Sequence, residues 1–153
     1  GVIGGLKDSS GSDSGIRAVI LEIKKLNLPS FVVLTGSELT VDSALMFGAD
    51  GVIPGIGNID PAGYVKIYDL VSSGDYLAAR KEQERLFAMF GLVDVGASDR
   101  MGRGSSAIGA FKAALKLLGI IEDARTAPPA IALNENEVAA IKPFLTRAGL
   151  NLK

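Results

Sequence analysis

Three short apolar runs, each followed by a helical pattern, constrain the fold more than any other feature of the chain. The runs cover residues 2–7, 31–34 and 51–53, and helical periodicity follows at residues 16–26 and 38–47. After the third run, Pro61 directly behind Asp60 is a typical helix start. Strands that alternate with helices form parallel sheets with right-handed crossovers. The sequence therefore predicts an α/β fold built on a parallel sheet.

Beyond the third unit the sequence contains no convincing strand and predicts helices. Their expected ranges are residues 62–71, 76–90, 105–118 and 135–148. Asn134 and Glu137 have the spacing of a capping box before the last helix, and Gly149 is placed to end it. We therefore expect two regions: the three βα units at residues 1–73, and a C-terminal helical region at residues 74–153 that packs on them.

Composition excludes several classes of protein and of chemistry. A hydrophobic share of 48% with 22% charged residues is typical of a soluble globular protein. The net charge of -1 without a basic cluster argues against a nucleic-acid partner, and no apolar run is long enough for a membrane span, so a cytoplasmic protein is predicted. Because Cys and His are absent, zinc sites of the usual ligands, thiol nucleophiles and a histidine base are excluded. Catalysis must use other groups, with lysine prominent among them, and no cofactor is implied.

Lys7 stands at the end of the first apolar run, before a polar turn, and has two interpretations. Most lysines at strand ends only reach solvent. Alternatively, a buried and partly neutral amine attacks a carbonyl to form a Schiff base. The carboxyl ends of parallel strands meet at one edge, where ligands bind. The other two strands end in segments 36–38 and 53–55. Both segments are rich in small residues, which let a ligand approach the backbone. Lys7 is the reactive amine at that edge.

Two neighbouring loops raise competing hypotheses. Residues 8–13 resemble a calcium loop but lack the glutamate at its twelfth position and a preceding helix, so helix capping is favoured and no metal is predicted. Residues 54–58 are glycine-rich enough to cradle a phosphate, yet they match neither the dinucleotide fingerprint nor the P-loop spacing. For Asn58 the competing interpretation is a hydrogen bond that fixes the loop.

Charged residues near expected helix starts also have alternative roles. Arg100 and Arg103 precede the helix at residues 105–118, where they can bind an anion or make structural contacts. Ser37 is predicted to cap the helix at residues 38–47. Glu38 would lie in the first turn of that helix, where it either interacts favourably with the helix dipole or contacts a substrate.

A set of motifs in order along the chain resembles the dihydrodipicolinate synthase and N-acetylneuraminate lyase family. The likeness covers essentially the whole chain and rests on the order and separation of several motifs. They are Gly5-Leu6-Lys7-Asp8-Ser9-Ser10-Gly11, Leu34-Thr35-Gly36-Ser37-Glu38, Gly48-Ala49-Asp50-Gly51-Val52-Ile53-Pro54-Gly55, Asn58 with Pro61, and Gly74-Asp75.

The resemblance implies a (β/α)8 TIM barrel, of which this chain is the carboxyl-terminal portion, strands six to eight, followed by a C-terminal helical region. It implies that Lys7 forms an imine with pyruvate, which becomes an enamine that attacks an aldehyde, or in reverse lets a carbon-carbon bond break. The residues that it places around the substrates are Ser9 beside the lysine, Gly36, Ser37 and Glu38 at the second substrate, and Ile53 with Gly55 at the pyruvate-derived part.

Two elements of the family's site do not occur in this sequence: the tyrosine of the fifth strand and the Gly-Thr-Thr-Gly-Glu-like loop of the second. We therefore interpret the chain as lacking strands one to five and expect it to be inactive without the missing N-terminal half of the barrel. The expected partners are pyruvate or another 2-oxo acid, an aldehyde, that N-terminal half, and further copies in a homo-oligomer, a tetramer by family resemblance. A 4-hydroxy-tetrahydrodipicolinate synthase-like lyase is the leading hypothesis. The alternatives are an N-acetylneuraminate or 2-keto-3-deoxy sugar-acid aldolase, and an inactive barrel fragment.

Overall fold

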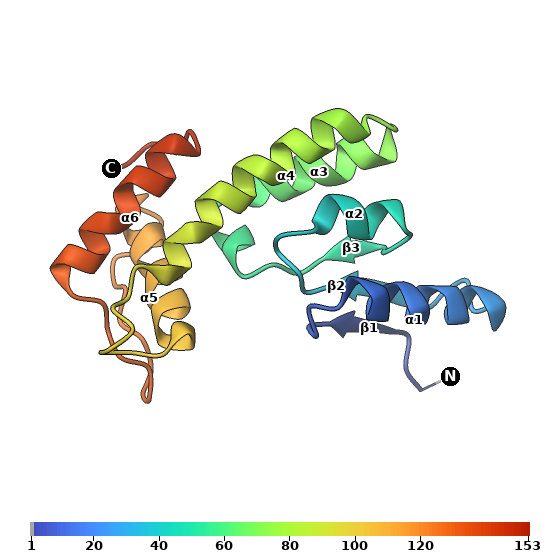
Figure 1. Cartoon of the computed structure of the whole chain (residues 1–153), viewed down its shortest axis with the longest axis horizontal. Coiled ribbons are helices and arrows are strands. Elements are labelled where there is room, and N and C mark those ends of the chain that lie inside the picture. The colour runs from blue at the N-terminus through green and yellow to red at the C-terminus, as the bar shows by residue number, and fades with distance from the viewer. Residues whose placement is uncertain (1) are drawn as a thin grey trace. The chain divides into compact units, whose positions relative to one another are not determined.

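The computed structural model describes residues 2–153 and divides the chain into two compact units, Gly1–Glu84 and Arg85–Lys153. The first unit is built on a parallel sheet in the order β1-β2-β3, whose strands are Gly5–Asp8, Val32–Thr35 and Gly51–Val52 (Figure 1). This confirms the predicted parallel arrangement. The architecture is a three-stranded parallel sheet whose strands are connected and followed by helices.

Four helices and one short turn connect and follow these strands. They are α1 (Asp13–Lys25), α2 (Val41–Met46), the 3-10 turn η1 (Ile56–Asn58), α3 (Pro61–Ser72) and α4 (Tyr76–Phe90). Asp60 caps α3 by accepting a hydrogen bond from the Gly63 amide at 3.0 Å, as the Asp-Pro pair predicts. The predicted cap of α2 is wrong, because α2 begins at Val41 and Ser37 lies in the preceding loop.

One face of the sheet packs against α1 and α2 and forms the core of the first unit. Val33 of β2 is buried there with Ile16 and Ile20 of α1 and Ala44 of α2, and Leu6 packs against the same cluster. Side chains alternate between the two faces of a strand, so the neighbours of Leu6 and Val33 point away from this core.

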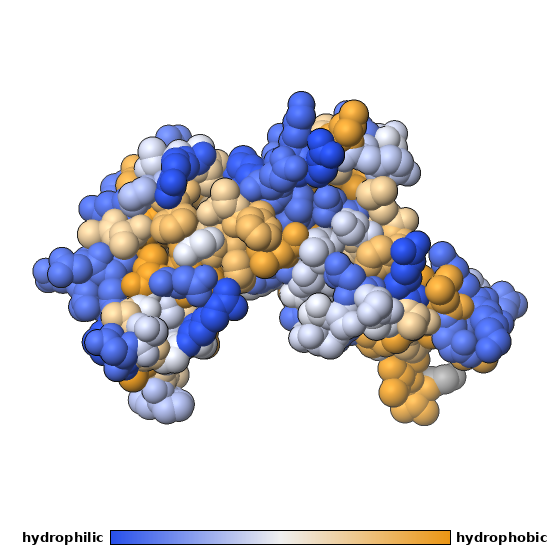
Figure 2. All heavy atoms as spheres, viewed as in Figure 1, coloured by the Kyte–Doolittle hydropathy of each residue, from blue (hydrophilic) through white to orange (hydrophobic). Residues whose placement is uncertain are grey.

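The opposite face of the sheet, which we call the open face, is presented by Gly5, Lys7, Val32, Leu34 and Gly51. These residues lie beside one another in register, because Gly5 is paired with Val32, Lys7 with Leu34, and Leu34 with Gly51. Val32 is 43% exposed, and the apolar Val2 and Ile3 before β1 are also exposed. Figure 2 shows hydrophobic atoms uncovered at this amino-terminal end. The first unit thus displays apolar surface that proteins of this size normally cover.

The second unit contains the end of α4, the 3-10 turn η2 (Gly91–Asp94), α5 (Arg103–Leu117) and α6 (Glu135–Arg147). Its apolar core consists of side chains that are fully or almost fully buried: Leu86, Met89, Leu92, Val93, Ala110, Ala114, Ile141 and Leu145. The capping box of α6 is confirmed: Asn134 accepts from the Glu137 amide, and Glu137 accepts from the Asn134 amide. Within residues 2–153 no helix combines the length and the apolarity needed to cross a membrane.

Candidate functional site

Lys7 occupies β1 and projects from the open face. Its partner in the neighbouring strand is Leu34, which also points to that face. Lys7 is exposed, so the expectation that its amine is buried is wrong for this structure. The physical reason is that burial requires a covering layer, whereas the core of the first unit lies behind the sheet on its other face.

Gly36 brings the ends of β1 and β2 into contact beside Lys7. The Gly36 amide donates to the Asp8 carbonyl at 2.6 Å. A Cβ atom at Gly36 would lie 2.8 Å from Ser9 Oγ, 2.9 Å from the Asp8 carbonyl oxygen and 3.0 Å from Lys7 Cε. Only a residue without a side chain fits there. Three predicted site residues, Lys7, Ser9 and Gly36, therefore meet at one point of the sheet edge.

The loop of residues 36–40, between β2 and α2, is held by a chain of hydroxyl groups. The Ser37 amide donates to Thr35 Oγ1 at 3.0 Å. The hydroxyls of Ser37 and Thr40 are 2.9 Å apart, and Thr40 Oγ1 donates to the Asp13 carboxylate at 2.9 Å. Because the Thr40 hydroxyl proton goes to Asp13, the Ser37 hydroxyl donates to Thr40. Ser37 is thus tied into the loop, half-buried at the sheet edge.

Glu38 connects this loop with the segment that follows β3. Its carboxylate accepts from the Ile56 amide at 2.8 Å, and its carbonyl accepts from Tyr64 Oη at 3.0 Å and from Gln83 Nε2 at 3.1 Å. The interpretation of Glu38 as a first-turn partner of α2 is wrong, since the residue precedes that helix. Its role as a substrate contact stays a prediction.

The segment after β3 carries the other two predicted residues, Ile53 and Gly55. The Ile53 amide donates to the Thr35 carbonyl at 3.0 Å, and its side chain is 49% exposed. Beside it lies an open depression of about 550 Å³ between β3 and α3. Asn58 Nδ2 donates to the Gly55 carbonyl at 2.8 Å, which confirms the loop-fixing interpretation. A phosphate cradle is disfavoured, because the Ile56 amide is already bound by a carboxylate.

Residues 8–13 form a turn and a helix cap, as the sequence favoured. Asp8 Oδ1 accepts from the Ser10 amide at 2.8 Å, and Ser12 Oγ caps α1 by accepting from the Gly15 amide at 3.0 Å. No cluster of three acidic or other metal-binding side chains occurs within the part of the chain that the structure describes.

Arg100, in the loop before α5, and Arg103, the first residue of α5, are both engaged by carboxylates, which confirms structural contacts for them. Arg103 Nε donates to Asp94 at 2.8 Å, and Arg100 pairs with Glu137 and with the Ala132 carbonyl. The hydrogen bonds from the backbone amides of Ala97 and Asn134, then that from Arg100, hold the pKa of Glu137 below its ordinary value of 4.5. The cluster fastens the loop before α5 to the start of α6.

Comparisons with known proteins show the family and related folds. A family model described as the dihydrodipicolinate synthetase family matches residues 2–148. The 4-hydroxy-tetrahydrodipicolinate synthase of Desulfotalea psychrophila is 28% identical over 97% of this chain. Among solved structures, YagE of Escherichia coli K12, whose crystal structure contains pyruvate, has a TM-score of 0.82 at 26% identity over 98% of this chain. Dihydrodipicolinate synthase from Bacteroides thetaiotaomicron has a TM-score of 0.82 at 29% identity over 93% of it.

The chain spans about half the length of these relatives. It covers 45% of the Desulfotalea protein, 47% of the YagE chain and 45% of the Bacteroides chain. YagE is described as a putative 2-dehydro-3-deoxy-D-gluconate aldolase, so the relatives include both a synthase and an aldolase.

Proposed function

The chain belongs to the dihydrodipicolinate synthetase family, and on that premise we propose that Lys7 is the nucleophile of a Schiff-base-forming, pyruvate-dependent lyase or aldolase. The observation that carries the proposal is the meeting of Lys7, Ser9 and Gly36 at the carboxyl edge of a parallel sheet. Ligands of parallel α/β folds bind at that edge. The pyruvate in the crystal structure of YagE supports the identity of the first substrate.

In the proposed reaction the neutral amine of Lys7 attacks C2 of pyruvate, and the adduct takes up a proton and loses water to leave a protonated imine. The imine withdraws electrons from the methyl carbon, so that a base removes one methyl proton and an enamine forms. The enamine carbon then bonds to the carbonyl carbon of an aldehyde, whose oxygen takes up a proton. Water finally cleaves the imine and restores the Lys7 amine. The reverse sequence breaks the same carbon-carbon bond.

The surrounding residues have separate roles in this proposal. Gly36 leaves room for the substrate beside the Lys7 side chain, because any side chain there would displace Lys7 Cε. Ser37 and Glu38 lie on the same loop and contact the second substrate. Ile53 and Gly55 border the pyruvate-derived part from the segment after β3.

The leading substrate assignment is a 4-hydroxy-tetrahydrodipicolinate synthase-like condensation, supported by the Desulfotalea relative. Cleavage of a 2-dehydro-3-deoxy sugar acid is the second candidate, favoured by the match to YagE. Both use the same lysine chemistry and differ in the aldehyde.

We further propose that the site is complete only when another polypeptide segment covers the open face. Lys7 and Val32 are exposed on that face, and the chain covers less than half the length of its relatives. Covering it would bury the Lys7 amine, which favours the neutral, nucleophilic form. In this account β1, β2 and β3 are strands six to eight of a barrel, the assembled protein is a homo-oligomer, and the 153 residues alone are inactive.

Exchange of the methyl protons of pyruvate in heavy water tests the proposal without knowledge of the aldehyde. The polypeptide that carries this sequence is expressed at its natural length, as the parent and as the variants Lys7→Arg and Lys81→Arg. Enamine formation predicts exchange in the parent and in Lys81→Arg, whose lysine is exposed on α4, and none in Lys7→Arg. Equal exchange in all three proteins would contradict the proposal.

A further inference from the structure

The start of α2 lacks a cap of its own and takes one from α4. Thr40, the residue before the helix, makes no side-chain cap hydrogen bond. Instead Gln83 Oε1 accepts from the amides of Val41 at 2.8 Å and Asp42 at 3.4 Å. The first amides of a helix have no hydrogen-bond acceptor within the helix. The Gln83 oxygen supplies the acceptor for these two amides.

The other end of the same Gln83 amide binds the loop that precedes α2. Nε2 donates to the Glu38 carbonyl at 3.1 Å, and Tyr64 Oη donates to that carbonyl at 3.0 Å. The assignment of the two amide atoms follows from chemistry, because the oxygen faces two amide donors and the nitrogen faces a carbonyl. Gln83 is 4% exposed, and a buried amide that loses its partners is costly.

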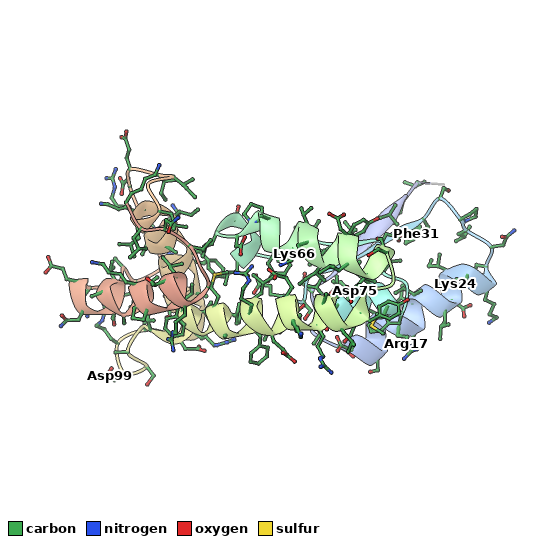
Figure 3. All side chains as sticks on the ribbon, turned by 90° about the horizontal axis from the view of Figure 1, so that it is seen from above. Arg17, Lys24, Phe31, Lys66, Asp75 and Asp99 are labelled. Carbon is green, nitrogen blue, oxygen red and sulfur yellow. The ribbon has the colours of Figure 1, made fainter. Side chains whose placement is uncertain are left out.

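The position of α4 relative to α3 is itself held one residue before Gln83. Lys66 of α3, labelled in Figure 3, donates to the Glu82 carboxylate of α4 at 2.9 Å. Glu82 is 6% exposed, whereas the side chain of Lys66 is 61% exposed, so a buried carboxylate meets a solvent-exposed ammonium group. Gln83 therefore reaches the loop of residues 36–40 from a part of α4 that the neighbouring ion pair ties to α3.

The backbone of Glu38 is thus bound by Gln83 and Tyr64, while its carboxylate is bound by the Ile56 amide. Gly36, at the other end of the loop, lies where an added Cβ would meet Lys7 Cε and Ser9 Oγ. A shift of the Glu38 backbone would move Ser37 and Glu38 most, because Gly36 is also held by its bond to Asp8 in the neighbouring strand.

We propose that Gln83 is a positioning residue for the second-substrate side of the site: it holds the backbone of Glu38 so that Ser37 and Glu38 meet the aldehyde. The inference rests on the proposed function. It predicts that the first half-reaction, imine formation at Lys7, is almost independent of Gln83, whereas recognition of the aldehyde depends on it.

Kinetics of the natural-length protein test this assignment with three variants. Gln83→Met keeps the side-chain length and removes all its hydrogen bonds. Gln83→Glu keeps an acceptor for the Val41 and Asp42 amides and removes the donor to Glu38. Lys81→Met introduces the same side chain at an exposed position of the same helix and serves as the control. The rate of borohydride-trapped imine formation with pyruvate, the melting temperature, and KM and kcat with pyruvate plus D-glyceraldehyde or L-aspartate 4-semialdehyde are measured.

Loss of the Glu38 contact is expected to raise the aldehyde KM about tenfold in Gln83→Met and in Gln83→Glu, as one to two buried hydrogen bonds imply. Imine formation should stay within about twofold of the parent in both, and Gln83→Glu should recover the melting temperature that Gln83→Met loses, because its acceptor restores the α2 cap. An unchanged aldehyde KM would overturn the inference. A parallel fall of imine formation, kcat and melting temperature would overturn it as well, since that pattern marks a purely structural role. Absence of an imine in the parent would instead refute the proposed function.

Discussion

Substitution of Gly36 by alanine adds one methyl group where the ends of β1 and β2 meet, and so tests how closely Lys7, Ser9 and Gly36 approach one another. The added Cβ would lie within 3.0 Å of Ser9 Oγ, the Asp8 carbonyl oxygen and Lys7 Cε, so each must retreat by about half an ångström to reach ordinary contact distance. The two side chains can turn aside. The Asp8 carbonyl cannot, because it accepts the Gly36 amide across the two strands.

The cost of such overpacking is about 1–3 kcal/mol of unfolding free energy. With the urea dependence usual for small proteins, the midpoint of unfolding falls by about 1 M. Displacement of Lys7 Cε also slows imine formation with pyruvate. Gly4→Ala is the matched control, because a Cβ at Gly4 has no neighbour within 4 Å. Urea unfolding followed by circular dichroism, together with the rate of borohydride trapping, measures both effects.

A Gly36→Ala protein with the urea midpoint and imine rate of Gly4→Ala would contradict this geometry. Such a protein would show that β1 and β2 do not approach as closely as described, or that Lys7 does not border Gly36. A loss of stability with an unchanged imine rate would contradict the contact with Lys7 alone.

Three further substitutions probe the local structure. Glu137→Gln should make the free energy of unfolding depend less on pH in the acid range. The pKa of Glu137 in the folded protein lies below its ordinary value of 4.5. The ionised carboxylate therefore stabilises the fold above pH 4.5, and this stabilisation is lost as the pH falls through the folded-state pKa. Acid unfolding identical to that of the parent would contradict this. Asn134→Ala should lower the unfolding free energy by about 1 kcal/mol through loss of the α6 cap, and an unchanged urea midpoint would contradict the cap. Gly48→Ala should cost about 1–2 kcal/mol, because Gly48 has a φ of 105° and would place its Cβ 3.2 Å from Lys24 Nζ. A neutral result in thermal unfolding would argue against that conformation.

Local signals in the sequence predicted most of the fold. The alternation of apolar runs and helical periods predicted the parallel sheet, and the Asp60-Pro61 and Asn134-Glu137 pairs predicted two helix starts. These features depend on neighbours a few residues apart, and such information is contained in the local sequence. The edge of the sheet that bears Lys7 followed from the direction of the strands.

The parts that sequence reasoning missed depend on contacts between distant residues. Ser37 was expected to cap α2, but Gln83, which follows the helix start by 42 residues, supplies the acceptor instead. Tyr64 was assigned no role at the site, yet its hydroxyl binds Glu38. No local pattern marks the Tyr64 side chain. For Gln83 the one available signal was a polar residue within the buried stripe of the amphipathic helix α4.

Reduction of the natural-length protein with borohydride in the presence of pyruvate, followed by peptide mapping, tests most directly whether Lys7 forms the imine. We expect one reduced pyruvyl adduct, located on Lys7 and absent from Lys7→Arg. Reduction without an adduct, or an adduct on another lysine that persists in Lys7→Arg, would contradict this expectation. Intact mass measured on the same sample shows which polypeptide segments accompany these 153 residues when the imine forms.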